Sequence, residues 1–306
     1  MLQFIRHYLL ALQFFTRVPV TGRLADWVGF SPAMLRASAA HFPGVGWLVG
    51  GVVAAVTWVL LALLPPGPVT SYSPLVAAVL GTVLSVLMTG AFHEDGLADV
   101  ADGLGGTLDR NRALEIMKDS RVGAFGAIAV VLALLAKVSL LALLGSLNAV
   151  LMCVALFLAH VVSRTWPLLT IRLLPHVGDI AGSKSKPLAD QISAASLLVA
   201  GVWCIAAFGA VLALGAVDSA GAAPKFVANL GLLSSPIGYS TGSCTVLLAV
   251  GLLANGLAWA VMTRWFARRL QGFTGDCLGA IQQVGEIAFY LGLALAWGVL
   301  RRSAGA

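Results

Sequence analysis

The sequence predicts an all-α protein that forms a polytopic bundle of transmembrane helices. Of its 306 residues, 59% are hydrophobic and only 10% are charged, and the mean hydropathy is +0.94. These values exclude an ordinary soluble domain. The apolar residues also fall in long runs, each close to the roughly 20 residues that a helix needs to cross a bilayer. Because no shift in composition divides the chain, we expect residues 1–306 to form one membrane-embedded domain with the lipid bilayer as a partner.

The N-terminal segment predicts an amphipathic helix at the membrane surface rather than a span. Arg6 and Arg17 interrupt its apolar run, and no small-residue cleavage site follows, so it is not a typical signal peptide. At helical pitch Arg6, Gln13 and Arg17 share one stripe, apart from the large apolar side chains. This pattern is typical of a helix that lies at the level of the lipid headgroups.

About seven spans follow, although six or eight also fit the sequence. We expect them at residues 41–64, 74–92, 124–147, 149–172, 192–217, 245–263 and 286–300. Small residues four positions apart recur in the first two spans, at Gly46 and Gly50 and at Ala77 and Gly81. Such spacing lets helices approach closely and predicts a compact bundle. Between the fifth and sixth spans, residues 218–242 are rich in Gly, Pro and Ser and predict an external loop.

The distribution of basic residues predicts which loops share a side of the membrane. With a cytoplasmic N-terminus, the loops 93–123, 173–191 and 264–285 lie on the cytoplasmic side together with most lysines and arginines. Arg301 and Arg302 are exceptions to this count. The asymmetry also explains the formal charge of +6, which therefore does not indicate a nucleic-acid partner. We expect the three loops to build one site together.

Carboxylates crowd the segment that follows the second span. Seven of the 13 acidic residues fall between positions 94 and 119. Asp95, Asp99 and Asp102 stand at i, i+4 and i+7, so on a helix they project from one face within about 60° of each other. Hard oxygen ligands of this kind suit Mg²⁺, which keeps several waters and accepts phosphate oxygens as further ligands. The pattern predicts a magnesium site for phosphate chemistry; the alternative is a solvated acidic helix start that Asp95 caps.

Polar residues near this cluster are candidates for substrate contacts. His93 precedes the cluster and points away from it on an ideal helix. Downstream, Lys118, Asp119, Arg121 and Gly123 lie where the chain re-enters the membrane, which is a suitable place to hold a phosphate. The alternative for this mixed-charge segment is a helix face that is merely solvated.

Further candidates lie in later segments. Arg164 falls within a predicted span, where a charge costs at least ~2.5 kcal/mol unless it is paired or faces a wet cavity. Lys137 is a weaker candidate of the same kind, since it can snorkel or pair. Gly275 and Asp276 lie in a glycine-bracketed turn that either brings backbone close to a phosphate or only reverses the chain. The four cysteines lack metal-ligand spacing and are typical of small buried hydrophobes.

Three ordered motifs resemble those of the cobalamin synthase family, the adenosylcobinamide-GDP ribazoletransferases that complete vitamin B12 assembly. They run from Phe92 to Gly103, from Leu114 to Gly123 and from Thr274 to Ala280. Residues 14–19 and 42–46 are also similar to the family, so the resemblance covers nearly the whole chain. Ala91 stands where glycine is expected, Glu94 occupies a position that is often apolar, and residues 124–125 replace a more polar pair. None of these departures removes a predicted ligand.

The resemblance implies an enzyme of the bacterial inner membrane with its active site facing the cytoplasm. It implies transfer of adenosylcobinamide phosphate from adenosylcobinamide-GDP to α-ribazole or its 5′-phosphate, with release of GMP. One or two Mg²⁺ ions would lie on Asp95, Asp99 and Asp102, and Asp119 or one of these three aspartates would accept the proton of the ribazole hydroxyl. The remaining candidates would contact substrate: His93, Lys118, Arg121, Gly123, Arg164, Gly275 and Asp276. The oligomeric state, including a homo-oligomer, stays open.

Two other functions compete with this interpretation. A phosphotransferase of the CDP-alcohol type also sets aspartates on helices around Mg²⁺, but its later aspartates stand four apart, whereas Asp102 follows Asp99 by three. A cation or metabolite transporter would use the acids as a permeation site. Transporters usually place such residues near the middle of the membrane on broken helices, and here the sequence places them at an edge.

Overall fold

The computed structural model describes residues 2–65, 72–178, 192–219 and 241–304. Over these ranges the chain is helical, and its only extended pairing is an isolated bridge between His176 and Phe273. The predicted all-α class is therefore confirmed. Most of the expected external loop 218–242 and of the loop 173–191 lies outside the described residues.

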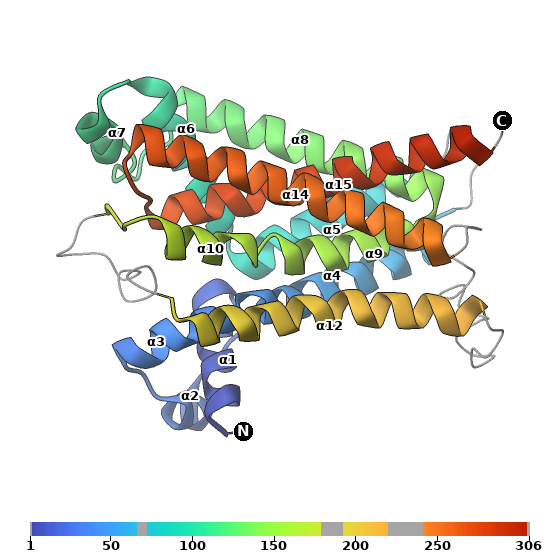
Figure 1. Cartoon of the computed structure of the whole chain (residues 1–306), viewed down its shortest axis with the longest axis horizontal. Helices are drawn as coiled ribbons and strands as arrows, with labels where there is room; N and C mark the ends of the chain where they lie inside the picture. Colours follow the sequence, from blue (N-terminus) through green and yellow to red (C-terminus); the bar gives the residue numbers. More distant parts are fainter. Residues whose placement is uncertain (1, 66–71, 179–191, 220–240, 305–306) are drawn as a thin grey trace.

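The helices form a bundle whose long members run side by side along one direction (Figure 1). Six segments of the described chain are long and apolar enough to cross a membrane. They are α4 (Phe42–Leu63) with the short helices before it, α8 (Ala124–Leu147), α9 (Ala149–Val162) continued by α10 (Trp166–Leu173), α12 (Ala194–Ser219), α14 (Thr241–Arg269) and α15 (Gly275–Ala304). A bent pair of helices adds a seventh candidate. The expected number of about seven is confirmed, and the chain is a multi-pass membrane protein.

The bent pair consists of α5 (Ser73–Thr89) and α6 (Phe92–Gly106), whose axes differ by 88°. The bend occurs at Gly90 and Ala91, which both have left-handed backbone angles, with φ of 65° and 58°. Glycine adopts this conformation at no steric cost, whereas alanine is strained there. The predicted span 74–92 therefore ends at Thr89, and the acidic segment leaves it as a separate helix.

The last span is longer than predicted. The sequence indicated residues 286–300, but α15 begins at Gly275, and α14 extends to Arg269, so the predicted loop 264–285 shrinks to a short connection. Gln282 and Gln283 fall within the predicted loop and Glu286 at the start of the predicted span, and all three side chains are buried. Internal hydrogen bonds replace the water that polar side chains would otherwise need.

The N-terminal helix α1 (Leu2–Phe15) lies at one end of the bundle and runs across the direction of the spans (Figure 1). Its 14 residues correspond to about 21 Å, too short for a hydrocarbon core of about 30 Å. The two short helices α2 (Gly22–Val28) and α3 (Pro32–Ser38) and the 3₁₀ turn η1 (Ala39–His41) lead from it into α4. The prediction that this segment is a helix but not a span is confirmed, and its position at the level of the lipid headgroups stays a prediction.

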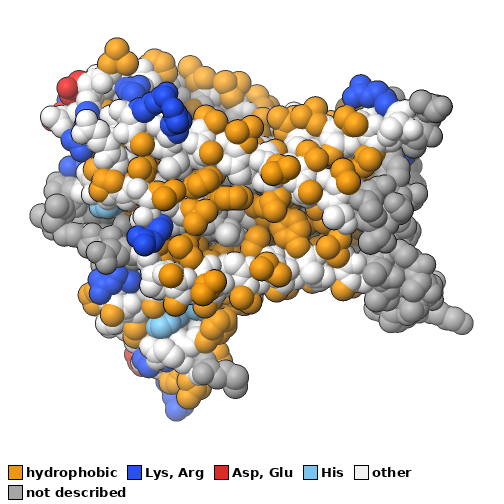
Figure 2. All heavy atoms as spheres, viewed as in Figure 1, with side chains coloured by type: hydrophobic (Ala, Val, Ile, Leu, Met, Phe, Trp, Pro, Cys, Tyr) orange, Lys and Arg blue, Asp and Glu red, His pale blue; other side chains and the backbone are white. Residues whose placement is uncertain are grey.

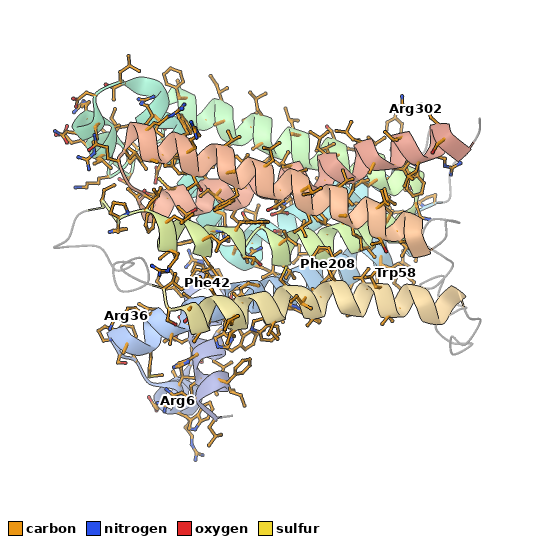
Figure 3. The ribbon with its side chains drawn as sticks, viewed as in Figure 1. Arg6, Arg36, Phe42, Trp58, Phe208 and Arg302 are labelled. Atoms are coloured by element: carbon orange, nitrogen blue, oxygen red, sulfur yellow. The ribbon has the colours of Figure 1, made fainter. Side chains whose placement is uncertain are left out.

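Basic side chains gather at the end of the bundle that carries α1, α6 and α7 (Arg110–Ile116) (Figure 2). Arg6 and Arg36 lie at this end, and Arg302 lies at the opposite end (Figure 3). The expected excess of lysines and arginines on one side of the bundle is therefore present, and the C-terminal arginines are the exception. Between the two ends, hydrophobic side chains cover much of the surface seen in Figure 2, as expected of a surface that faces lipid.

Small residues allow the close packing of α4 against α9. A Cβ atom on Gly46 would overlap the backbone of His160, and one on Gly50 would lie 2.9 Å from the carbonyl oxygen of Phe157. On α5, a Cβ atom on Gly81 would lie 2.6 Å from the hydroxyl of Thr57 on α4. The small-residue spacing thus predicted the helix contacts correctly.

The substitution Gly46→Ala is expected to destabilise the bundle by about 1–3 kcal/mol, because the added methyl group overpacks the contact between α4 and α9. Gly51→Ala is the matched control on the same helix, since its Cβ would meet nothing within 4 Å. Thermal unfolding of both variants in detergent provides the measurement. Equal unfolding temperatures for the two variants would contradict this packing.

Candidate active site

The acidic cluster lies on α6. Asp95 is exposed, Asp99 is half-buried and Asp102 is buried. The burial of these side chains thus increases along α6 from its N-terminal end. The charges that act on Asp99 come from three carboxylates, those of Asp276, Asp95 and Asp102. The three predicted aspartates thus share one neighbourhood, and a fourth joins them.

The fourth carboxylate belongs to Asp276 in the first turn of α15. The two helices cross closely at Gly96, where a Cβ atom would lie 2.8 Å from the carbonyl oxygen of Asp276. The hydroxyl of Thr274 donates a hydrogen bond to Asp276 Oδ2 at 3.2 Å and fixes its orientation. The sequence predicted Asp276 as a substrate contact in a turn, apart from the acidic cluster. The structure places it in the first turn of α15, and the crossing of α6 and α15 makes it a member of the cluster.

Asp102 has protein partners of its own. Its Oδ2 accepts a hydrogen bond from the backbone N–H of Gly123 at 2.7 Å, and its Oδ1 accepts one from Gly126 at 2.8 Å. Both donors lie at the start of α8, where backbone N–H groups lack partners within the helix and a negative charge is favourable. Asp102 therefore caps α8, which ties the acidic helix to a span. Each of its oxygens keeps a second lone pair.

The donor set of the cluster fits a hard divalent cation only in part. In the described part of the chain, no lysine, arginine or histidine lies in ion-pair distance of Asp95, Asp99 or Asp276. Among the described residues, no basic side chain therefore balances the repulsion among these carboxylates by a direct ion pair. In the same ranges, no group of three or more His, Cys, Asp or Glu side chains lies so that it could hold a metal ion without further ligands. Mg²⁺ commonly binds through one or two carboxylates and completes its shell with water and phosphate oxygens.

The segment between α7 and α8 places the predicted cationic contacts at the surface. Arg121 is exposed, and its guanidinium forms an ion pair with Asp119 at 2.5 Å. The hydrogen bonds from Arg121 lower the pKa of Asp119 to about 2, which makes Asp119 a weak proton acceptor. Lys118 is exposed nearby. The backbone N–H of Gly123 is used by Asp102.

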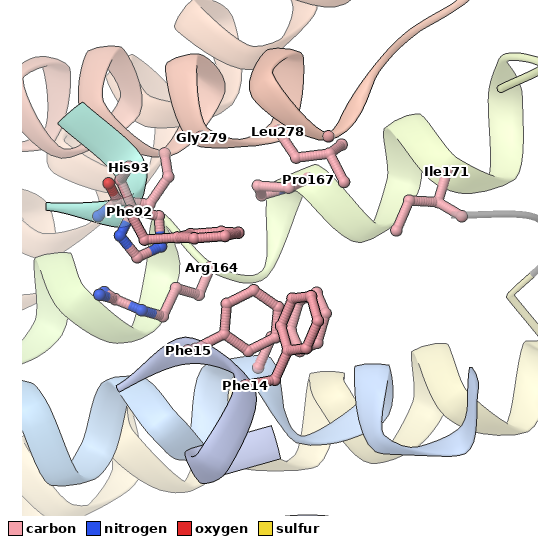
Figure 4. A pocket seen from close by; sticks show the side chains of 12 residues that line it. Phe14, Phe15, Phe92, His93, Arg164, Pro167, Ile171, Leu278 and Gly279 are labelled. Carbon is pink, nitrogen blue, oxygen red and sulfur yellow. The ribbon is translucent and has the colours of Figure 1, made fainter. Parts of the chain in front are cut away.

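A cavity with mostly apolar walls lies beside the acidic cluster. It is lined by Phe14, Phe15, Phe42, Phe92, His93, Arg164, Pro167, Ile171, Gly275, Leu278, Gly279 and Gln282. In Figure 4 the rings of Phe14 and Phe15 face Pro167 and Leu278 across it. His93, Phe92 and Arg164 lie at one end of this view, and Ile171 lies at the other. The cavity adjoins the acidic cluster through α15, because Gly275 in its wall precedes Asp276, whereas His93 points away from Asp95 on α6.

Arg164 lies between α9 and α10 and is only 4% exposed. Its Nη1 donates a hydrogen bond to the carbonyl oxygen of His160 at 2.9 Å and lies 3.1 Å from His160 Nδ1. Among the described residues, its Nε has no hydrogen-bond partner. His93 is buried nearby and is within reach of the charge of Arg164. The structure therefore brings together two predicted substrate contacts from separate segments of the chain.

Behind the cavity, Glu286 forms the centre of a buried polar network that the sequence did not predict. Its carboxylate is 2.7 Å from Lys137 Nζ, and both residues are almost fully buried. Tyr290 donates its hydroxyl to Oε1 at 2.8 Å, and Gln282 donates to Oε2 at 2.7 Å. His160 Nε2 lies 3.8 Å from the same carboxylate. This network links α8, α9 and α15.

The network also reaches the acidic helix. Gln283 donates its amide N–H groups to Glu94 Oε1 at 3.0 Å and to Gln282 Oε1 at 2.9 Å. Glu94 faces the interior, while its neighbour Asp95 is exposed. The sequence does show two opposite charges within apolar runs, Lys137 and Glu286. Their pairing could not be predicted from it, because it depends on the packing of α8 against α15.

The chain is similar to a known protein family over most of its length. The sequence profile described as cobalamin-5-phosphate synthase matches residues 7–294. A protein of Albidiferax ferrireducens named adenosylcobinamide-GDP ribazoletransferase is 67% identical over 295 residues, which cover 96% of this chain and 99% of that protein. Proteins with the same name are 60% identical in Polaromonas naphthalenivorans, covering 96% and 99%, and 37% identical in Vibrio cholerae, covering 93% and 91%. No solved structure matches the chain.

The substitution Lys137→Met is expected to lower the free energy of unfolding by about 3–5 kcal/mol, because it leaves the buried carboxylate of Glu286 without its counter-charge. The double variant Lys137→Met/Glu286→Gln removes both charges and is expected to recover part of this loss. Unfolding titrations in detergent, evaluated as a double-mutant cycle, measure the coupling. Additive effects of the two substitutions would show that the pair does not act as a unit.

Proposed function

Because this chain belongs to the cobalamin-5-phosphate synthase family and is thus a transferase of cobalamin biosynthesis, we propose that it transfers adenosylcobinamide phosphate from adenosylcobinamide-GDP to α-ribazole or α-ribazole 5′-phosphate and releases GMP. The observation that carries this proposal is the meeting of Asp95 and Asp99 on α6 with Asp276 on α15. A cluster of carboxylates without a direct ion pair to any described basic side chain, beside a cavity, is suited to a diphosphate substrate that arrives with a divalent cation.

We assign the binding of Mg²⁺ to Asp95 and Asp99, with Asp276 as a third candidate and Asp102 holding the cluster to α8. When bound there, Mg²⁺ would neutralise negative charge on the diphosphate oxygens. Lys118 and Arg121, at the same end of the bundle, are assigned to the outer phosphate oxygens. His93, Arg164, Gly123 and Gly275 remain proposed substrate contacts.

In the proposed reaction a ribazole hydroxyl attacks the phosphorus that stays with cobinamide. The bond from this phosphorus to the GMP oxygen breaks, and the hydroxyl proton passes to a base of the protein. Asp119 was one candidate for this base, but its ion pair with Arg121 opposes proton uptake. A carboxylate of the α6 cluster is therefore the better candidate.

We place the protein in the bacterial inner membrane with this site on the cytoplasmic side. The gathering of basic side chains around the site supports this orientation through the positive-inside rule (Figure 2). Adenosylcobinamide-GDP and GMP are charged and would exchange with the aqueous compartment at this edge.

The protein purified in detergent is expected to release GMP only when adenosylcobinamide-GDP, α-ribazole 5′-phosphate or α-ribazole, and Mg²⁺ are all present. Chelation of divalent cations should abolish the release, and added Mg²⁺ should restore it. Chromatographic quantification of GMP and of the cobalamin product measures both. Release of GMP without any ribazole, or product formation in the presence of excess chelator, would contradict the proposal.

Substitutions in the acidic cluster should distinguish the proposed metal ligands, Asp95 and Asp99, from Asp102, which caps α8. Asp95→Asn and Asp99→Asn are expected to lower GMP release by at least about 100-fold, while the unfolding temperature stays equal or rises because like charges are removed. Asp102→Asn should lower the unfolding temperature, because an amide NH₂ cannot accept one of the two backbone hydrogen bonds from α8. A wild-type stability for Asp102→Asn would remove its assignment as a cap.

Added Mg²⁺ provides a readout that is independent of turnover. It is expected to raise the unfolding temperature of the wild-type protein and to have little effect on Asp95→Asn or Asp99→Asn. Glu115→Gln is a suitable control, because Glu115 is exposed and pairs with Arg112 rather than with the cluster.

A further inference from the structure

We propose that the phenylalanine-lined cavity binds the flat, apolar base of the ribazole substrate, an assignment that rests on the transfer reaction proposed above. No aspartate of the acidic cluster lines this cavity, so it differs from the cluster in chemistry, and it adjoins the cluster where Gly275 precedes Asp276. The apolar base would therefore bind in aromatic surroundings, and the diphosphate would bind at the carboxylates.

The walls favour a planar aromatic ligand. Phe15 lies at ring-centroid distances of 4.8 Å from Phe14, 5.5 Å from Phe92 and 4.1 Å from Phe42, in edge-to-face arrangements. This cluster presents ring faces and edges to the cavity, which suits the stacking and T-shaped contacts of a flat heterocycle. Aromatic side chains bind bases through such contacts without reading hydrogen bonds.

The other groups of the two substrates fit this cavity less well. Guanine carries several hydrogen-bond donors and acceptors, and phenyl rings would leave most of them unpaired at considerable cost. The corrinoid ring is a wide macrocycle bordered by amides and meets the same objection. The dimethyl-substituted benzimidazole of ribazole is uncharged and almost wholly apolar, and its one free ring nitrogen is an acceptor.

Arg164 supplies a donor for that nitrogen. Its side chain lines the cavity and is 4% exposed, yet its Nε has no hydrogen-bond partner among the described residues. A buried N–H without a partner is costly, and an acceptor on a ligand would satisfy it. His160 holds the other side of the guanidinium and fixes its position.

The placement of the cavity is also consistent with the direction of the reaction. Gly279 allows α15 to approach α6, since its Cβ would lie 3.3 Å from the backbone of His93. Because Gly275 lines the cavity and precedes Asp276, a base held between α1 and these two helices would place its ribose near that carboxylate. The aromatic contacts would thus orient the attacking hydroxyl.

The test compares Phe14→Ala and Phe92→Ala with the matched control Phe30→Ala, whose side chain is 68% exposed and does not line the cavity. Equilibrium dialysis with α-ribazole measures binding to the full-length protein in detergent. We expect the dissociation constant for α-ribazole to rise by about 5- to 150-fold in the two cavity variants, as typical for loss of a base–aromatic contact. Phe92→Tyr, which keeps the ring, should bind almost as the wild type.

Two further measurements keep the proposal falsifiable if one variant fails to fold. Free 5,6-dimethylbenzimidazole should compete with α-ribazole for the wild-type protein, and the KM for adenosylcobinamide-GDP should change less than about twofold in Phe14→Ala. Unchanged α-ribazole binding in a folded cavity variant, or no competition by the free base, would overturn the assignment. A selective rise in the KM for adenosylcobinamide-GDP would overturn it in favour of the corrinoid.

These results separate the two proposals. If the wild-type protein releases GMP as expected but the cavity variants bind α-ribazole normally, only the cavity assignment fails. If α-ribazole binds in a cavity-dependent manner but no GMP is released with both substrates and Mg²⁺, the transfer reaction fails and the binding site stands.

Discussion

The close crossing of α6 and α15 is the contact on which the rest of the site depends. Gly96 on one helix and Gly279 on the other lack side chains, so their backbones meet where any Cβ atom would crowd the neighbour. This contact brings Asp276 next to Asp95 and Asp99, although some 180 residues of chain separate them. Without it, α6 would carry an ordinary acidic face, and repulsion alone would drive the two segments apart.

The buried network around Glu286 opposes this repulsion from within the bundle. A charge inside an apolar environment must be paired, and here Lys137 of α8 supplies the pair at 2.7 Å. Gln283 extends the network to Glu94, so that α6 is held from its inner side while its outer side carries the aspartates. Asp102 adds a second attachment through the start of α8. Groups outside the acidic cluster, namely the Glu286 network and the start of α8, therefore hold α6 in place.

Local patterns in the sequence predicted the parts of this arrangement that one helix determines. The spacing of Asp95, Asp99 and Asp102 indicated a shared face, and Gly46 and Gly50 indicated a close helix contact, because both follow from the 3.6-residue period alone. The sequence did not predict that α15 begins at Gly275. The polar side chains in its first turns are buried because they form hydrogen bonds with residues far away in the sequence. The role of Asp102 as a cap and the pairing of Lys137 with Glu286 likewise depend on long-range packing, which a single sequence does not encode in any local pattern.

The division of the site into a charged and an aromatic part follows from its position at the edge of the bundle. Carboxylates require water or cations nearby, so Asp95 faces outward at the break that Gly90 and Ala91 create after α5. Phenylalanines require the opposite surroundings, and α1 supplies them by lying across the ends of the spans, where Phe14 and Phe15 reach the start of α6. A straight helix in place of the 88° bend would carry the aspartates along the span and away from α1. The bend therefore makes it possible for one short helix to border both environments, with Phe92 and His93 on the cavity and Asp95 and Asp99 beyond it.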